Sequence, residues 1–240
     1  MTAPAPTLTS TDQTGYAGWR SALVLSAAEQ QTCRDVHQLH QLVLTGFREP
    51  HLTTAVPAAP TPHVLYAAAR RPAERDANRK LVAGLPEKIV VQSPVRPNWQ
   101  PLLDSQRLAH ANTFEIEQTY RVSDDVEVRV IANPTYRDNQ TGRRIGITSA
   151  AECGAWLLRH LARHGLDVAP DRVVVGPGER LTGTDGKGHN ITVIGRELRA
   201  QGTVHDPQAF HQAITSGLGR AKPYGCGLLL TRPRNHSGDR

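Results

Sequence analysis

Near its carboxyl end the chain carries a glycine-rich segment, Gly217-Leu218-Gly219-Arg220-Ala221-Lys222-Pro223-Tyr224-Gly225-Cys226-Gly227, on which the assignment of the fold mainly depends. Its four glycines, Gly217, Gly219, Gly225 and Gly227, allow the backbone to approach a bound group closely. Arg220 and Lys222 add positive charge beside backbone N–H groups, which suits a phosphate. A glycine-rich turn that leads into an edge strand explains the same residues equally well.

Two familiar phosphate-binding loops are excluded for this segment. It lacks the G-x-x-x-x-G-K-[ST] pattern of the Walker A loop. It also follows a predicted helix at 206–216 and precedes a predicted strand at 228–231, whereas the turn of a dinucleotide-binding unit precedes its helix.

The second half of the chain, which contains this segment, alternates strands and helices. Ser149 caps a predicted helix that ends near Gly165. The predicted strands lie at 113–121, 126–133, 144–148, 172–182, 190–201 and 228–231. The first half repeats the alternation, with a strand at 19–25, a helix at 32–45, strands at 63–69 and 88–92, and a short helix that ends near 108.

Two such alternations predict an α+β protein with two tandem ferredoxin-like (RRM-like) domains. We expect these domains at 17–109 and 110–232. Residues 1–16 are predicted to be a disordered extension and 233–240 a flexible tail. A proline-rich loop is predicted at 50–62, and no sequence repeat relates the halves.

Two histidines, His37 and His40, lie three residues apart on the first predicted helix and therefore share a face. His40 lies at the edge of the apolar stripe and His37 slightly farther out. A pair of imidazoles can act as base and acid near neutral pH. Two ordinary surface histidines are the alternative. No third or fourth ligand at a recognisable spacing supports a zinc site.

The predicted helix at 149–164 carries a basic face. Arg159 and Arg163 lie opposite its leucines, and Arg143 and Arg144 lie just upstream. This stripe could follow a phosphate backbone, and a solvated helix face is the alternative. Trp156 falls on the polar side of the helical wheel, where another element or a ligand must cover it.

Composition limits the classes of function. Lys and Arg outnumber Asp and Glu by 28 to 22, which favours a polyanionic partner, although ordinary variation in charge gives the same balance. The three cysteines, Cys33, Cys153 and Cys226, are far apart, so neither a disulfide framework nor a zinc site is expected. The amino terminus does not read as a signal peptide, and no apolar run is long enough for a membrane span. We expect a cytoplasmic protein with no cofactor and no metal.

Taken together, several segments resemble the CasE family of CRISPR-associated endoribonucleases, within the RAMP superfamily. The resemblance covers about residues 19–232. It rests on the G-x-G-x-x-K-x-x-G-x-G-L-L pattern from Gly217 and on three shorter matches. These are Asp35-Val36-His37-Gln38-Leu39-His40, Ile131-Ala132-Asn133-Pro134 and Ala155-Trp156-Leu157-Leu158-Arg159.

The resemblance implies a metal-independent enzyme that binds the stem-loop of a CRISPR repeat. It cuts the RNA at the 3′ base of the hairpin by attack of the RNA's own 2′-hydroxyl, and a 2′,3′-cyclic phosphate remains. Members are subunits of the type I-E Cascade complex, so the implied partners are the precursor and mature CRISPR RNA and the other Cascade subunits.

The resemblance also implies roles for individual residues. His40 matches the family's catalytic histidine. His37 stands where relatives often carry tyrosine, which leaves three roles open for it: positioning the ribose, sharing proton transfer, or contributing little. Arg220 and Lys222 would contact phosphate. Arg143, Arg144, Arg159 and Arg163 would grip the RNA stem.

Two other functional classes compete with this hypothesis. One is a subunit of the same fold that binds the hairpin but has lost cleavage, and only the presence of His40 favours the enzyme over it. The other is a basic protein scaffold without an RNA role, against which the glycine-rich segment and the basic helix both argue.

Overall fold

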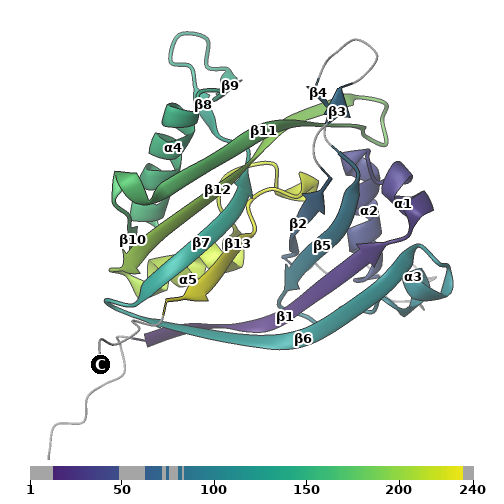
Figure 1. Cartoon of the computed structure of the whole chain (residues 1–240), viewed down its shortest axis with the longest axis horizontal. Helices are drawn as coiled ribbons and strands as arrows, with labels where there is room; N and C mark the ends of the chain where they lie inside the picture. Colours follow the sequence, from purple (N-terminus) through teal and green to yellow (C-terminus); the bar gives the residue numbers. More distant parts are fainter. Residues whose placement is uncertain (1–12, 49–62, 72–73, 76–80, 83, 235–240) are drawn as a thin grey trace, which may run out of the picture.

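The computed structural model describes residues 13–48, 63–71, 74–75, 81–82 and 84–234. They form two units, each an antiparallel sheet with helices on one face (Figure 1). The predicted loop at 50–62 lies outside the described residues.

The first unit is built on a four-stranded sheet in the order β2-β5-β1-β6. Its strands are β1 (Gln13–Leu25), β2 (Leu65–Arg70), β5 (Pro86–Ser93) and β6 (Leu108–Arg121). Its helices are α1 (Ala27–Thr32), α2 (Val36–Thr45) and α3 (Gln100–Asp104). A small hairpin of β3 (Glu74–Arg75) and β4 (Leu81–Val82) lies apart from the sheet.

The second unit repeats this connectivity. Its sheet runs β10-β12-β7-β13, and β11 also pairs with β12. The strands are β7 (Asp125–Ala132), β10 (Leu166–Asp167), β11 (Val173–Thr184), β12 (Asn190–Val204) and β13 (Leu229–Pro233). The helices are α4 (Ala150–Arg163) and α5 (Pro207–Ser216), with short 3₁₀ turns at Pro170–Arg172 and Lys222–Tyr224. A separate hairpin joins β8 (Thr135–Arg137) to β9 (Arg144–Gly146).

The central strands are β1 and β5 in the first unit and β7 and β12 in the second, and a helix follows each of them before the next strand of the same sheet. This is the β-α-β-β-α-β arrangement of the ferredoxin-like fold. The predicted α+β class with two tandem ferredoxin-like units is therefore confirmed.

One strand was assigned to the wrong half. Residues 113–121 were expected to open the second half, but they belong to β6, which pairs with β1 from Gln13↔Arg121 to Leu25↔Leu108. The expected boundary near residue 110 thus falls inside β6. A tight turn at Ser123 separates β6 from β7, yet β7 pairs with β12 and β13 and not with β6. Local turn chemistry cannot reveal a partner about a hundred residues earlier in the chain.

Other expectations also need correction. Residues 13–16 were assigned to a disordered extension but form the start of β1, and Tyr16 is buried. Pro233 was assigned to the tail but ends β13. The helix expected at 32–45 begins only at Val36, because Asp35 caps a new helix after α1 ends at Thr32.

Each unit has its own hydrophobic core, and the β1–β6 ribbon reaches both. Leu23 and Leu25 of β1 pack in the first core. At the other end of the ribbon, Tyr16 and Tyr120 pack in the second core, where the Tyr120 ring meets Phe210 edge-on at 4.9 Å between centroids. Figure 1 shows the ribbon running beneath both units.

Polar contacts also cross between the units. The Arg20 guanidinium donates to the Gln92 side-chain oxygen at 2.7 Å, and the Gln92 amide donates to the carbonyl oxygen of Ile214 at 3.1 Å. The Gln118 amide donates to the carbonyl oxygen of Thr231 at 3.3 Å. The two units are therefore held in a defined relative position.

Candidate functional site

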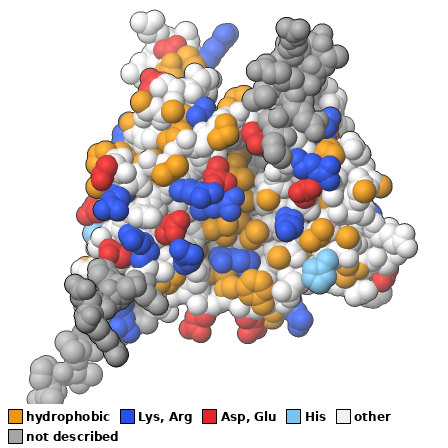
Figure 2. All heavy atoms as spheres, viewed as in Figure 1, with side chains coloured by type: hydrophobic (Ala, Val, Ile, Leu, Met, Phe, Trp, Pro, Cys, Tyr) orange, Lys and Arg blue, Asp and Glu red, His pale blue; other side chains and the backbone are white. Residues whose placement is uncertain are grey.

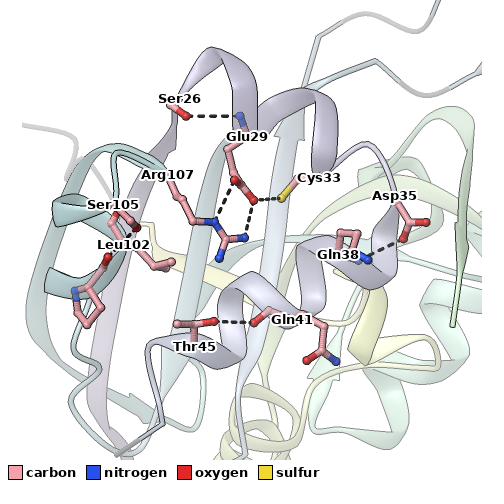
Figure 3. A network of polar contacts seen from close by, with 11 residues as sticks. Ser26, Glu29, Cys33, Asp35, Gln38, Gln41, Thr45, Leu102, Ser105 and Arg107 are labelled. Carbon is pink, nitrogen blue, oxygen red and sulfur yellow. Dashed lines mark hydrogen bonds and ion pairs between the residues drawn. The ribbon is translucent and has the colours of Figure 1, made fainter. Parts of the chain in front are cut away.

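Helix α2 carries both predicted histidines, and its amino end is fixed by Asp35. One carboxylate oxygen of Asp35 accepts the backbone N–H groups of His37 at 2.7 Å and Gln38 at 3.1 Å, the latter bond visible in Figure 3. This is a conventional N-cap, which satisfies N–H groups that have no partner within the helix. Because the apolar side of α2 is buried, the histidines keep a fixed rotation about the helix axis. The buried residues are Val36, Leu39, Leu42 and Val43.

A second contact fixes α1, which precedes α2. The Glu29 carboxylate accepts two hydrogen bonds from the Arg107 guanidinium, at 2.7 and 3.0 Å, and one from the Cys33 thiol at 3.4 Å (Figure 3). The Arg107 contact holds the pKa of Glu29 below its usual range. The network ties α1 to the residues just before β6, behind the histidine helix.

His40 is half-buried and packs against an aromatic ring. Its imidazole lies 6.4 Å from the Tyr66 ring, centroid to centroid, with 19° between the planes. Burial lowers the pKa of His40, and the positive charge of a protonated His37 lowers it further. Its Nδ1 is buried and has no hydrogen-bond partner among the described residues. A histidine with a lowered pKa is neutral near pH 7 and can accept a proton.

The glycine-rich segment depends on its glycines for its backbone path. Gly217, Gly219, Gly225 and Gly227 all have positive φ, between +73° and +93°. Ala221 also adopts φ +62°, just before the 3₁₀ turn at Lys222–Tyr224. Side chains with a Cβ rarely adopt such angles, so these glycines are required by conformation.

This segment and helix α2 meet in space. The turn at Lys222–Tyr224 lies against α2 and β2. Val36 of the helix is buried in one cluster with Cys226, and Ala221 and Tyr224 pack against that cluster. The two regions that the sequence marked, almost two hundred residues apart, therefore lie against each other.

The two cations of the segment differ in their surroundings. Arg220 is exposed, whereas Lys222 is half-buried. Burial lowers the pKa of the Lys222 ammonium. Lys222 packs so closely on Gly227 that a Cβ at that glycine would lie 3.2 Å from the Lys222 Cγ. The structure thus fixes the base of the Lys222 side chain beside α2.

The prediction for Trp156 was only partly right. The ring is 4% exposed and belongs to the second core, so it does not lie on a polar face. Gly219 covers it, because a Cβ there would lie 3.0 Å from the ring. His160 stacks on the same ring at 3.9 Å, and its Nδ1 lies 2.9 Å from the Trp156 carbonyl oxygen. The Trp156 ring is therefore covered by other residues of the chain, and the contact with Gly219 joins α4 to the glycine-rich segment.

The four predicted stem-contacting arginines are all exposed. Arg159 and Arg163 lie on the outer face of α4, and Arg143 and Arg144 lie on the β8–β9 hairpin. Among the described residues, none of these four makes an ion pair with a carboxylate. Their charges are available to an external polyanion.

Strand β11 connects the basic helix with the histidine helix. Near the start of β11, Val173 and Val175 lie against Gly154 of α4. An ideal Cβ at Gly154 would be 3.6–3.7 Å from their side chains. At the end of β11, Gly183 and Thr184 meet the amino end of α2. One strand therefore spans the distance between the basic helix and the histidines.

Three further groups near the histidines were not identified from sequence. The Tyr66 hydroxyl donates to the Pro223 carbonyl oxygen at 2.6 Å. The Asp35 carboxylate also accepts the Thr184 N–H at 2.9 Å. In the β11–β12 turn, hydrogen bonds from His189 hold the pKa of Asp185 below its usual range, and His37 lowers it slightly more. Asp35 before a helix is a recognisable cap, but no sequence signal pointed to Tyr66 or Asp185.

A cleft of about 410 Å³ lies between β2, the edge strand of the first sheet, and strands β7, β11 and β12 of the second. Its walls include Arg70 of β2, Glu179 of β11 and an Arg129–Glu197 ion pair. Figure 2 shows hydrophobic side chains gathered along the middle of this face, with Lys and Arg side chains on both sides of them. Of the predicted site residues only Gly225 lines this cleft, and the histidines do not.

Among the residues that the structure describes, no three His, Cys, Asp or Glu side chains are grouped to hold a metal ion. No helix in the same part of the chain is long and apolar enough to cross a membrane.

A family model described as "CRISPR associated protein" matches residues 19–233. No curated protein matches the chain. Solved structures do match. Cse3 of Thermus thermophilus, bound to an RNA representing a pre-cleavage complex, is 20% identical with a TM-score of 0.69; the match covers 91% of this chain and 100% of Cse3.

Two further structures share the fold. Cas6e of Escherichia coli K-12 is 23% identical with a TM-score of 0.59, and the match covers 90% of this chain and 100% of Cas6e. A chain of a CRISPR RNA-guided surveillance complex is 21% identical with a TM-score of 0.55, again over 90% of this chain and 100% of that one. At these identities the likeness establishes the tandem ferredoxin-like fold.

Proposed function

This chain belongs to the family of CRISPR-associated proteins, whose model spans residues 19–233, and from that membership we propose that it is an endoribonuclease that processes CRISPR RNA. It binds the stem-loop of the repeat and cleaves the precursor at the 3′ base of the hairpin. It then stays on the mature RNA within a Cascade complex. The similar Cse3 structure holds a pre-cleavage RNA, and another similar chain belongs to an RNA-guided surveillance complex, which supports both parts of the proposal.

The observation that carries the proposal is the position of His40. A neutral, half-buried imidazole lies on a helix that contacts the glycine-rich segment, and that segment carries Lys222. The basic helix and hairpin supply exposed arginines that suit the backbone of an RNA stem. Base, phosphate contact and stem grip are the three functions that this cleavage requires.

The proposed reaction uses the RNA's own nucleophile. His40 accepts the proton of the 2′-hydroxyl while the 2′-oxygen bonds to the adjacent phosphorus. The bond from phosphorus to the 5′-oxygen breaks, and that oxygen takes up a proton. The products are a 2′,3′-cyclic phosphate and a 5′-hydroxyl. Lys222 and Arg220 stabilise the extra negative charge on the phosphate, and His37 is placed to share proton transfer or to hold the ribose.

The test is cleavage of the host's own repeat hairpin in EDTA. We expect cleavage by the wild-type chain and none by His40→Ala, which should still bind the hairpin tightly. His110→Ala, at an exposed position on β6, is the matched control and should cleave normally. A 2′-deoxy substitution at the cut site should block the reaction.

Other outcomes decide against parts of the proposal. A requirement for added metal, or full activity of His40→Ala, would contradict the mechanism. Cleavage of the 2′-deoxy hairpin would exclude the internal nucleophile. Tight binding without any cleavage by the wild-type chain would identify a hairpin-binding subunit that has lost its activity.

A further inference from the structure

The Asp35 carboxylate touches two elements that belong to different units. One oxygen caps α2 through the N–H groups of His37 and Gln38. The other oxygen accepts the N–H of Thr184 at the end of β11, 2.9 Å away. The same side chain that begins the histidine helix therefore also holds it to the hairpin of the second unit.

The Asp35 carboxylate is tightly packed against β11. A Cβ at Gly183 would lie 2.5 Å from the Asp35 oxygen and 3.1 Å from the backbone nitrogen of Val36. Val36 itself is fully buried with Leu181 and Val193 of the second unit. A shift of the hairpin tip would thus be transmitted directly to the first turn of α2.

We propose that Asp35 is a positioning residue, which sets His37 and His40 against the RNA surface of the second unit. This inference rests on the proposed function, because it assigns Asp35 a part in cleavage. His40 lies five residues beyond Asp35, about 7.5 Å along the helix axis. The basic helix, the glycine-rich segment and β11 belong to the second unit, whereas the histidines belong to the first. The Asp35–Thr184 bond directly joins the two sets of groups.

The chain offers a matched control for the cap. Asp206 begins α5 with the same chemistry, and its carboxylate accepts the N–H groups of Gln208 and Ala209, each at 3.0 Å. Asparagine caps helices about as well as aspartate. Asp35→Asn can therefore keep the cap, while its amide group cannot replace the second carboxylate oxygen as acceptor for Thr184.

The first experiment measures single-turnover cleavage and binding separately. We expect Asp35→Asn to lower the cleavage rate at saturating protein about 10- to 100-fold, the scale expected for a misplacement of about 1 Å in an active site. Its affinity for a 2′-deoxy hairpin should stay at the wild-type value. Asp206→Asn should change neither quantity.

The second experiment approaches the contact from its other side. Gly183→Ala places a methyl group against the Asp35 carboxylate and should reduce the cleavage rate in the same way. Gly186→Ala lies in the same hairpin turn, where an added Cβ meets no atom within 4 Å, and should cleave normally. Because both changes break one contact, Asp35→Asn combined with Gly183→Ala should lose less than the product of the two single losses.

Hydrogen exchange gives a readout that does not depend on activity. In Asp35→Asn the Thr184 amide should exchange faster, while the His37 and Gln38 amides stay protected. An unchanged Thr184 exchange rate would overturn the proposal, as would a wild-type cleavage rate in Asp35→Asn or an equal loss in Asp206→Asn. If the wild-type chain does not cleave, the proposed function fails, and with it the catalytic part of this inference. The exchange result then decides only whether Asp35 joins the units.

Discussion

The Tyr66 hydroxyl donates a hydrogen bond to the carbonyl oxygen of Pro223 at 2.6 Å, so a strand of the first unit holds the glycine-rich segment of the second. The Tyr66 ring also stacks on His40. Gly225 packs against the Tyr66 ring, because an ideal Cβ at Gly225 would lie 3.1 Å from it. Tyr66 therefore contacts both the imidazole and the segment that carries Lys222.

Replacement of Tyr66 by phenylalanine removes this hydrogen bond and keeps the ring. Because the protein loses one part-buried hydrogen bond while Pro223 stays exposed to water, we expect the free energy of unfolding to fall by about 0.5–1.5 kcal/mol. Cleavage should slow as the segment loosens. Urea unfolding and single-turnover assays measure the two effects, and Tyr136→Phe at a half-exposed ring is the control for stability. Unchanged unfolding would show that the bond contributes nothing.

Replacement of His37 by phenylalanine should change the pH dependence of cleavage. A protonated His37 helps to lower the pKa of His40. Without it, the pKa of His40 rises, so His40 becomes protonated at a higher pH on acidification. If neutral His40 is the base, the acidic limb of the rate profile moves to higher pH. Single-turnover rates between about pH 5 and pH 8 test this shift. An acidic limb that stays at the same pH, or moves to lower pH, would contradict the role given to His40.

Removal of Arg159 or Arg163 should weaken hairpin binding and reduce its salt dependence. Each arginine that contacts a phosphate contributes about 1 to the slope of log affinity against log salt. Titrations at several salt concentrations give this slope. Arg232 of β13 pairs with Glu127 of β7, and Arg232→Ala should leave the slope unchanged. An unaltered slope in the α4 variants would mean that this helix face is only solvated.

The thiols should be unreactive in the folded protein. Burial raises the pKa values of Cys33 and Cys226 to about 12, and it also raises the pKa of Cys153. Because the thiolate is the reactive form, an alkylating agent at about pH 8 should modify none of the three until the chain unfolds. Mass spectrometry before and after denaturation checks this, and rapid labelling of the native chain would refute it.

Most of the elements were predictable because their signals are local. Ser149 and Gly165 enclose α4, and the glycines at 217–227 mark a backbone with positive φ. The position of β6 was not predictable in this way. Its partner is β1, and the turn at Ser123 has the same local chemistry whether or not the flanking strands pair.

The residues of the candidate site also differ in whether a local sequence signal reveals them. His37 and His40 could be found by helical spacing, and Lys222 by its glycine neighbours. Tyr66 could not, because a buried aromatic residue in a strand has the same pattern whether it packs on lipophilic neighbours or on an imidazole. Trp156 was misplaced because a helical wheel does not include Gly219, which covers the ring from another part of the chain.

The ribbon of β1 and β6 has a consequence for the order in which the protein can be made. Tyr16 leaves the ribosome early, its strand partner β6 follows about a hundred residues later, and Phe210, which covers Tyr120, comes later still. The first sheet can be completed only after β6, which ends at Arg121, and its two tyrosines are not shielded from water until Phe210 has been synthesised. A nascent chain therefore exposes Tyr16 and then Tyr120 until Phe210 is made, and its amino-terminal half reaches its final form only with the help of its carboxyl-terminal half.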